Sequence, residues 1–324
     1  YLILWQSSSL VKSNYLISLP TLWARVKGFV PLMVLVLGYF LSEILDPLTP
    51  VIPYIITAML FMTFLKVKPS DIKWRWSHLA LLALQIALAI GVYLIIVPFH
   101  ADAATAMLLC FLTPAATAGP SIVQILRGDT AYIASYVLIT HLAFILITPF
   151  LFPYVGGIEV SEGILMQMWH IFYHVARLVL PAIVVAWLIV YLKPKVAFRL
   201  GSQTQVNYSF WLLSLLLLIA HTTMYLKRST HFEVSDLYLV ASLGLVTCVL
   251  QYLLGHVIAH RLGIEQHAAR HSLGQKNTSL SIWIAALFLP PLAGIGITSY
   301  IIWQNIIISS VMSYYSSKRQ KTIA

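Results

Sequence analysis

The residues best suited to chemistry lie in one short polar stretch inside an apolar segment, residues 266–288. The stretch carries amides, hydroxyls and one ammonium group, on Ser272, Gln275, Lys276, Asn277 and Thr278. In a bilayer core each unpaired polar group costs several kcal/mol, and a lysine at the centre of a helix costs roughly 2.5 to 3.5 kcal/mol. These side chains are therefore stable only where protein encloses them, and Gly274 weakens the helix beside them. The pattern predicts an interrupted membrane helix whose exposed backbone and side chains bind a solute.

A second apolar segment, residues 102–126, carries a comparable interruption. Two prolines, a glycine and three hydroxyls fall together here, at Thr113, Pro114, Thr117, Gly119, Pro120 and Ser121. The half-helix that begins near Pro120 would present free backbone N–H groups and a positive helix end, which favour an anion. The alternative interpretation is that these small residues only allow two helices to approach closely.

The composition places these segments in a membrane. Apolar residues make up 60% of the 324 residues and charged residues only 9%, whereas soluble domains carry about 25% charge. The net charge of +10 comes from short loops between apolar runs, so it indicates membrane topology and not a nucleic-acid partner. Cys110 and Cys248 lie in apolar runs and suggest neither a disulfide framework nor a metal site. The chain begins with Tyr1 and not with Met, so we expect further residues upstream.

Ten membrane spans are predicted from the apolar runs, since about 20 residues cross the ~30 Å hydrocarbon core. They lie at residues 28–45, 50–66, 77–98, 102–126, 129–153, 163–192, 206–226, 235–261, 266–288 and 291–316. Cytoplasmic loops are enriched in Lys and Arg, which provides a test of this division. With a cytoplasmic N-terminus nearly all of these residues fall in inner loops, and the outer loops hold only Lys227 and Arg228. We therefore expect both termini in the cytoplasm and the protein in the plasma (inner) membrane.

Ten spans divide into two halves of five, and because five is odd the halves face opposite ways. We expect an N-terminal interfacial segment at 1–25, a first repeat at 26–155, an inverted second repeat at 156–318 and a cytoplasmic tail at 319–324. The interrupted spans are the fourth of each half. Interruptions at corresponding places in inverted halves are the best sequence indication of a secondary transporter's binding site. The expected fold class is thus all-α, a five-plus-five inverted repeat with two broken, crossing helices.

At these residues the sequence resembles the bile acid:sodium symporter family, over nearly the whole chain after about residue 26. The similar motifs are Thr113-Pro114 through Arg127-Gly128-Asp129, Gly274 to Leu280, Trp303-Gln304-Asn305, and Thr148-Pro149. The resemblance implies a core domain, residues 77–153 plus 235–316, and a panel domain, residues 28–66 plus 163–226. Solute would bind between the two domains and reach each side of the membrane in turn.

The chain departs from the family at its sodium ligands. Gly119 and Pro120 stand in place of a Ser and an Asn, Ile133 and Val137 in place of a Ser and a Thr, Ser272 in place of a Glu, and Lys276 in place of a Gln. Of the side-chain ligands only Gln85, on the third span, matches. The resemblance therefore implies that sodium coupling is lost and that Lys276 occupies the place of a cation.

The remaining charges indicate the solute. All ten acidic residues fall in loops or at the ends of spans, so the buried charges are Lys276 and Arg177. We expect a small organic anion as solute. Three alternatives stay open for Lys276: it binds the anion, it carries a coupled proton, or it is a structural lysine bonded to the helix-end carbonyls of the fourth span. Arg177 either attracts anions into an outward-facing cavity or extends to the outer headgroups.

The main alternative to a transporter is a membrane di-metal enzyme, which three HxxxH pairs suggest: His170/His174, His256/His260 and His267/His271. Each pair shares a helix face. The loop charges put the first pair near the outer surface and the other two near the inner one, so we expect no enzyme, no metal site and no cofactor. A sensor that binds solute without moving it is the other alternative, and inverted halves favour transport over it.

Overall fold

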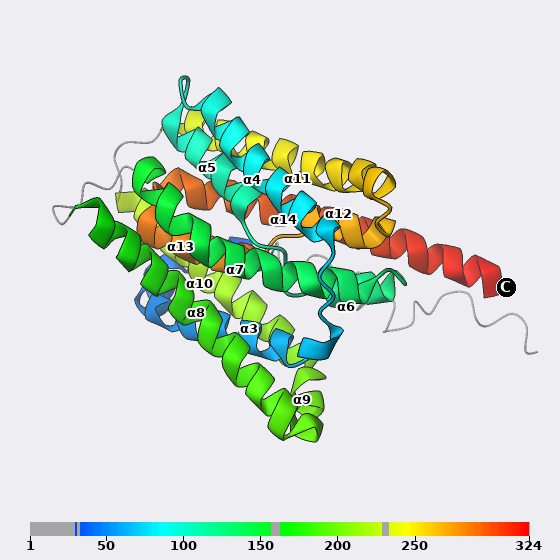
Figure 1. Cartoon of the computed structure of the whole chain (residues 1–324). Helices are drawn as coiled ribbons and strands as arrows, with labels where there is room; N and C mark the ends of the chain where they lie inside the picture. The colour runs from blue at the N-terminus through cyan, green and yellow to red at the C-terminus, as the bar shows by residue number, and fades with distance from the viewer. Residues whose placement is uncertain (1–29, 31–32, 157–162, 229–232, 324) are drawn as a thin grey trace, which may run out of the picture.

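The computed structural model describes residues 30, 33–156, 163–228 and 233–323 (Figure 1). Every named element in this part of the chain is helical, which confirms the all-α expectation. The interfacial segment predicted at 1–25 lies outside the described residues. The helices run along a common direction in an elongated bundle, and their bounds are α2 (Ser42–Leu45), η1 (Asp46–Val51), α3 (Ile52–Phe64), η2 (Pro69–Asp71), α4 (Trp76–Ile96), α5 (Ala101–Leu112), α6 (Gly119–Ile125), α7 (Thr130–Val155), α8 (Ile164–Leu192), α9 (Pro194–Gly201), α10 (Thr204–Arg228), α11 (Val234–Leu262), α12 (Gln266–Gly274), α13 (Thr278–Phe288) and α14 (Pro291–Ile323).

Seven helical segments of the described chain are long and apolar enough to cross a membrane. They are α4, α7, α8, α10, α11, the first 22 residues of α14, and the run from Ser42 to Phe64 that joins α2, η1 and α3. Their outward side chains include many exposed large hydrophobic residues, such as Tyr54, Leu94 and Phe150, as lipid contact requires. The protein is therefore an integral membrane protein. Helices α5 and α13 are apolar but shorter, because each is one part of an interrupted segment.

The chain reverses direction at η1. Gly38, before this turn, lies against Leu216 and Ile219 of α10, whereas Met59, after it, lies against Ser214 of the same helix. The two arms therefore run in opposite directions along α10. Asp46 at the turn accepts from His221 Nδ1 at 2.9 Å, which ties the reversal to the far part of α10.

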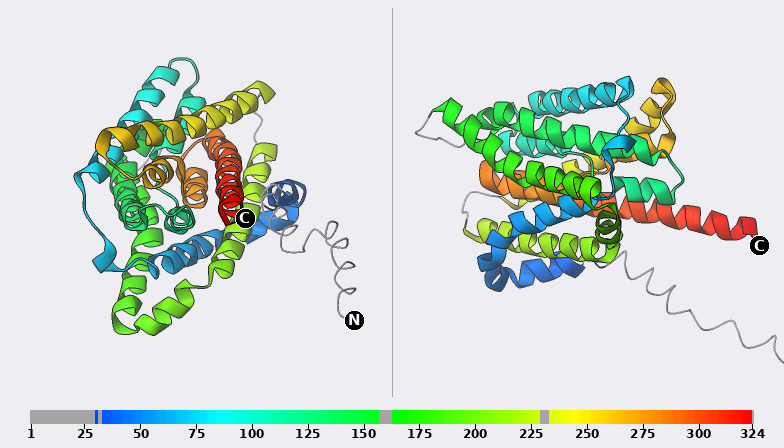
Figure 2. Two further views of the ribbon diagram at one scale, coloured as in Figure 1. Left: turned by 90° about the vertical axis from the view of Figure 1, so that its right-hand side faces the viewer. Right: turned by 60° about the horizontal axis from the view of Figure 1, so that its bottom comes forward.

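Two groups of helices make up the bundle. Helix α3 packs against α8 and α10, while α5, α11 and α14 pack together with α4 on their outer side. The left view of Figure 2, which looks along the bundle, shows α12 and α13 in orange near its middle. The interrupted segments thus lie at the centre of the molecule.

Two features differ from the predicted division of the chain. Helix α9 follows α8 directly, in a stretch predicted as a loop; it begins at Pro194, which suits the first turn of a helix. It buries Ala197 and exposes Phe198. Helix α14 continues to Ile323, through most of the tail predicted at 319–324.

Candidate functional site

The first interruption separates α5 from α6. Pro114 has no backbone N–H and disfavours helical geometry in the residue before it. Thr113 accordingly leaves the helix with ψ of 130°, and its hydroxyl donates back to the carbonyl of Leu109 at 2.6 Å. The chain resumes a helix at Gly119, with Pro120 in its first turn.

The second interruption separates α12 from α13. Gly274 packs its backbone directly against Tyr252 of α11, and a Cβ atom there would lie 2.5 Å from the tyrosine ring. Only glycine permits this approach. Gln275 is extended, and the Asn277 side chain accepts from the backbone N–H of Leu280, so it caps the start of α13.

The two interruptions cross and pair as a minimal antiparallel ladder. Ala115 and Lys276 face each other in an isolated bridge. The Ala116 N–H donates to the Gln275 carbonyl at 2.8 Å, and the Asn277 N–H donates to the Pro114 carbonyl at 2.8 Å. The backbone groups that each broken helix leaves free are thus satisfied by the other.

Side chains on flanking helices satisfy the central residues of the ladder. The Ala115 N–H donates to Thr140 Oγ1 of α7 at 3.1 Å. On the other side of the ladder, the Lys276 N–H donates to Gln304 Oε1 of α14 at 2.6 Å, and Gln304 Nε2 donates to the Lys276 carbonyl at 3.4 Å. All these groups are buried, so the unwound backbone meets the requirement for polar groups at membrane depth.

The carboxyl end of α5 leaves carbonyl groups without partners inside the helix. Donors from three separate elements bind them: Gln251 Nε2 binds Cys110 O at 3.3 Å, Lys276 Nζ binds Phe111 O at 3.1 Å, and Gln85 Nε2 binds Leu112 O at 3.2 Å and Thr113 O at 3.1 Å. A carbonyl at the end of α12 also has a side-chain donor: the Tyr300 hydroxyl donates to the Gly274 carbonyl at 2.7 Å.

Lys276 is the charged member of this set. Its side chain is 1% exposed and its ammonium points at the end of α5. That helix end carries roughly half a negative charge, which favours a cation. Of the three roles that the sequence leaves open for this residue, the observed contact corresponds to the bond with helix-end carbonyls.

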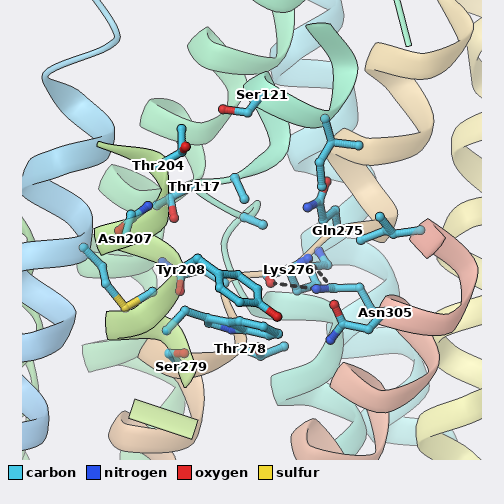
Figure 3. Close-up of a pocket in the computed structure, with 18 of the residues that line it drawn as sticks. Thr117, Ser121, Thr204, Asn207, Tyr208, Gln275, Lys276, Thr278, Ser279 and Asn305 are labelled. Carbon is cyan, nitrogen blue, oxygen red and sulfur yellow. Dashed lines mark hydrogen bonds between the residues drawn. The ribbon is translucent and has the colours of Figure 1, made fainter. Parts of the chain in front are cut away.

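A cavity of about 290 Å³ lies beside the crossing (Figure 3). Helices α3 and α10 form one wall, and the two interruptions with α14 form the other. The first wall contributes Met59, Lys66, Thr204, Asn207, Tyr208 and Trp211. The second contributes Ala116, Thr117, Ala118, Ser121, Ile122, Gln275, Lys276, Asn277, Thr278, Ser279, Gln304, Asn305 and Ile308.

The lining combines hydrogen-bonding groups with aromatic surface and has no carboxylate among these residues. Figure 3 shows the Tyr208 ring extending from α10 across the cavity toward Asn305. Its centroid lies 5.6 Å from that of Trp211. Lys66, just beyond the end of α3, adds a positive charge at the edge of the cavity. The lining thus offers hydrogen-bonding groups, aromatic faces and a positive charge to a bound molecule.

The predicted site residues divide into two sets. Six line the cavity: Thr117, Ser121, Gln275, Lys276, Asn277 and Thr278. The others lie elsewhere. Gln85 and Thr113 belong to the capped end of α5, Ser272 is buried within α12, and Gly119 packs against Ile133, where a Cβ atom would lie 2.7 Å from the isoleucine side chain. Pro120 occupies the first turn of α6.

Arg177 lies apart from the crossing. It lines a second cavity of about 960 Å³ beside the other end of α3, together with Thr49, Tyr54 and Trp283. The structure therefore does not bring Arg177 together with Lys276.

The wall formed by α10 was not predicted. Thr204, Asn207, Tyr208 and Trp211 repeat at intervals of three and four residues, which places them on one helix face. This polar and aromatic repeat at the start of an apolar span was the available signal. Gln304 figured in the family resemblance but not among the predicted site residues.

In the described part of the chain no group of three or more His, Cys, Asp or Glu side chains is placed to hold an ion, at the histidine pairs or elsewhere. His271 Nδ1 instead contacts Gln275 Oε1 at 3.1 Å, and His174 Nδ1 contacts the His170 carbonyl at 2.8 Å. The rings of His271 and His174 thus make local hydrogen bonds.

No protein-family model matches the chain, and no curated protein matches it. A functional assignment therefore depends on the geometry of the crossing and on the motifs in the sequence.

Proposed function

We propose that the protein is a secondary transporter of a small organic anion that works by alternating access without sodium. The observation that carries this proposal is the position of the cavity. It lies between α3 and α10 on one side and two crossed, interrupted helices on the other. Interrupted helices at a cavity deep in a membrane protein are the usual site of solute binding in secondary transporters.

The proposal includes ten spans arranged as an inverted repeat. Equivalent partners on both sides of the ladder support it. Ala115 is bound by Thr140, which lies four residues after the buried Tyr136, and Lys276 is bound by Gln304, which lies four residues after the buried Tyr300. Tyr136 in turn donates to Gln85 at 2.9 Å. Two helices with the same spacing of tyrosine and polar residue thus serve the two interruptions.

We also propose that α3, α8 and α10 belong to a panel domain and that the crossing belongs to a core domain that moves against it. The cavity lining comes from both groups of helices, so relative movement would open it to one side and then the other. Lys66, in a loop that the charge pattern assigns to the cytoplasm, lines the cavity edge. In this proposal the described conformation is the one open to the cytoplasm.

Sodium independence follows from the ammonium of Lys276. It binds the carbonyl of Phe111 at a helix end whose partial negative charge would attract a monovalent cation. In this proposal the chain is a divergent member of the bile acid:sodium symporter family in which a fixed charge replaces the mobile ion.

The test is a thermal-shift screen of purified protein against small carboxylates, sulfonates and sulfates, repeated in sodium and in choline salts. A ligand that binds the folded state raises the melting temperature by mass action. We expect stabilisation by an anion that is equal in both salts, followed by uptake of that anion into proteoliposomes. Stabilisation only in sodium would refute sodium independence, and binding without uptake would identify a sensor.

Proton coupling is the second candidate, because the ammonium of Lys276 is fully enclosed and a lysine amine can release and recover a proton. Uptake driven by an imposed pH gradient, and lost in Lys276→Gln, would favour it. Uptake independent of the gradient in the wild type would exclude it.

A further inference from the structure

Arg177 is a charged side chain inside a membrane helix and has no acidic partner among the described residues. It lies in the middle of α8 and is exposed. The ion pairs of the described residues involve other cations. The guanidinium of Arg177 lies over the ring of Tyr173, 5.5 Å from the ring centroid. An ionisable residue at such a position is rare and normally has a defined partner.

The depth of Arg177 in the membrane follows from a contact of the next residue, Leu178. Thr57 Oγ1 donates to the carbonyl of Leu178 at 3.4 Å, so this turn of α8 is level with Thr57. Thr57 lies five residues after the start of α3, which is about 8 Å below the chain reversal at η1. The loop charges place that reversal at the outer surface. A long arginine side chain at this depth reaches the level of the outer headgroups.

The cavity beside Arg177 is a mostly apolar groove of about 960 Å³. Helices α3 and α8 form its sides, and Trp283 and Leu287 of α13 contribute to its lining. Tyr54 at its edge is 76% exposed and Val185 is 45% exposed, so the groove is open laterally to the surrounding acyl chains.

We propose that this groove binds one anionic phospholipid of the outer leaflet, with the phosphate on Arg177 and an acyl chain along the groove. The planar guanidinium donates two parallel hydrogen bonds to phosphate oxygens, which lysine cannot reproduce. The groove offers no carboxylate to compete, since none of its lining residues is acidic. His221, which also lines it, is already bound to Asp46. An anionic headgroup is favoured over a zwitterionic one because the latter brings a cation to the arginine.

This site is independent of the transport proposal, but it has a structural link to the crossing. Trp283 and Leu287 belong to α13, which begins at the interruption, whereas Arg177 and Tyr54 belong to α8 and α3. One lipid molecule therefore contacts both groups of helices and holds them in the arrangement described here.

The experiment is lipid binding to the purified full chain by native mass spectrometry, with phosphatidylglycerol or phosphatidylcholine titrated into detergent. We expect phosphatidylglycerol to bind the wild type more tightly than phosphatidylcholine. Arg177→Gln should weaken phosphatidylglycerol binding about tenfold, because it removes charge-assisted hydrogen bonds. Arg177→Lys should recover only part of the loss. Arg199→Gln, which removes another exposed arginine, on α9, should bind as the wild type does.

A second variant separates the groove from the charge. Val185→Trp leaves Arg177 in place but fills the groove, so it should also weaken phosphatidylglycerol binding. Equal binding of phosphatidylglycerol by the wild type, Arg177→Gln and Arg199→Gln would mean that the arginine only reaches bulk headgroups, and would overturn the proposal. Glycerol phosphate that competes as well as the whole lipid would overturn the role of the acyl chain.

Discussion

The hydroxyl of Tyr300 provides the most direct test of how the interrupted helices are stabilised. Its ring is fully buried, and its hydroxyl donates to the carbonyl of Gly274, the last residue of α12, at 2.7 Å. Tyr300→Phe keeps the volume of the ring and so creates almost no cavity. It leaves a buried carbonyl without a donor, which costs about 1–3 kcal/mol. At an unfolding entropy of about 2.1 cal/mol/K per residue, a loss of about 2 kcal/mol lowers the melting temperature of a 324-residue chain by roughly 3 °C.

The assay is thermal unfolding in one detergent, followed by intrinsic fluorescence and by size-exclusion chromatography of heated samples. Tyr238→Phe is the matched control, because that tyrosine is 72% exposed at the start of α11 and should leave the melting temperature unchanged. Tyr136→Phe should lower it, since it removes the bond that orients Gln85. If Tyr300→Phe melts with the wild type, the end of α12 has another donor and the account of the capped interruption is wrong.

Three further changes test neighbouring parts of the site. Gly274→Ala places a methyl group 2.5 Å from the ring of Tyr252 and should destabilise the protein by about 1–3 kcal/mol through overpacking; the double variant with Tyr252→Leu should recover part of the loss in the same melting assay. Glu265→Ala removes the side chain that caps α12 and also accepts from the Asp129 N–H at 3.1 Å, so we expect a loss of about 0.5–2 kcal/mol, and unchanged unfolding would contradict this capping role. Lys66→Gln should weaken binding of an anion found in the screen by a few-fold, as expected for an exposed ion pair worth up to about 1 kcal/mol, and should reduce the dependence of the dissociation constant on salt in a titration at several ionic strengths.

The positions of the interruptions could be predicted because local chemistry determines them. Pro114 cannot donate a backbone hydrogen bond, and Gly274 stands beside three polar side chains in an apolar run, so each sequence by itself disfavours a continuous helix. Which helix end receives the ammonium of Lys276 depends on two segments far apart in the chain, and the sequence offered three roles without deciding among them. The observed bond from the ammonium to the Phe111 carbonyl corresponds to one of these roles, the bond with helix-end carbonyls.

The opposite wall of the cavity was not predicted, for a related reason. Asn207 and Trp211 fall at the start of the span predicted at 206–226, and only the packing of α10 against α3 turns their face toward the crossing. Helix α9 was missed because its eight residues are too short for a clear periodic pattern. In both places tertiary contacts, and not local preference, determine the outcome.

The caps at the end of α5 have a consequence for biosynthesis. Phe111 and its lysine partner are 165 residues apart in the chain, and at about 5–20 residues per second a ribosome needs roughly 8–33 s to make the intervening segment. During that interval the first half resides in the translocon or bilayer with the carbonyls of Cys110 and Phe111 still without their side-chain donors. Insertion machinery or water must shelter this helix end until the second half emerges, so neither half is expected to mature when it is made alone.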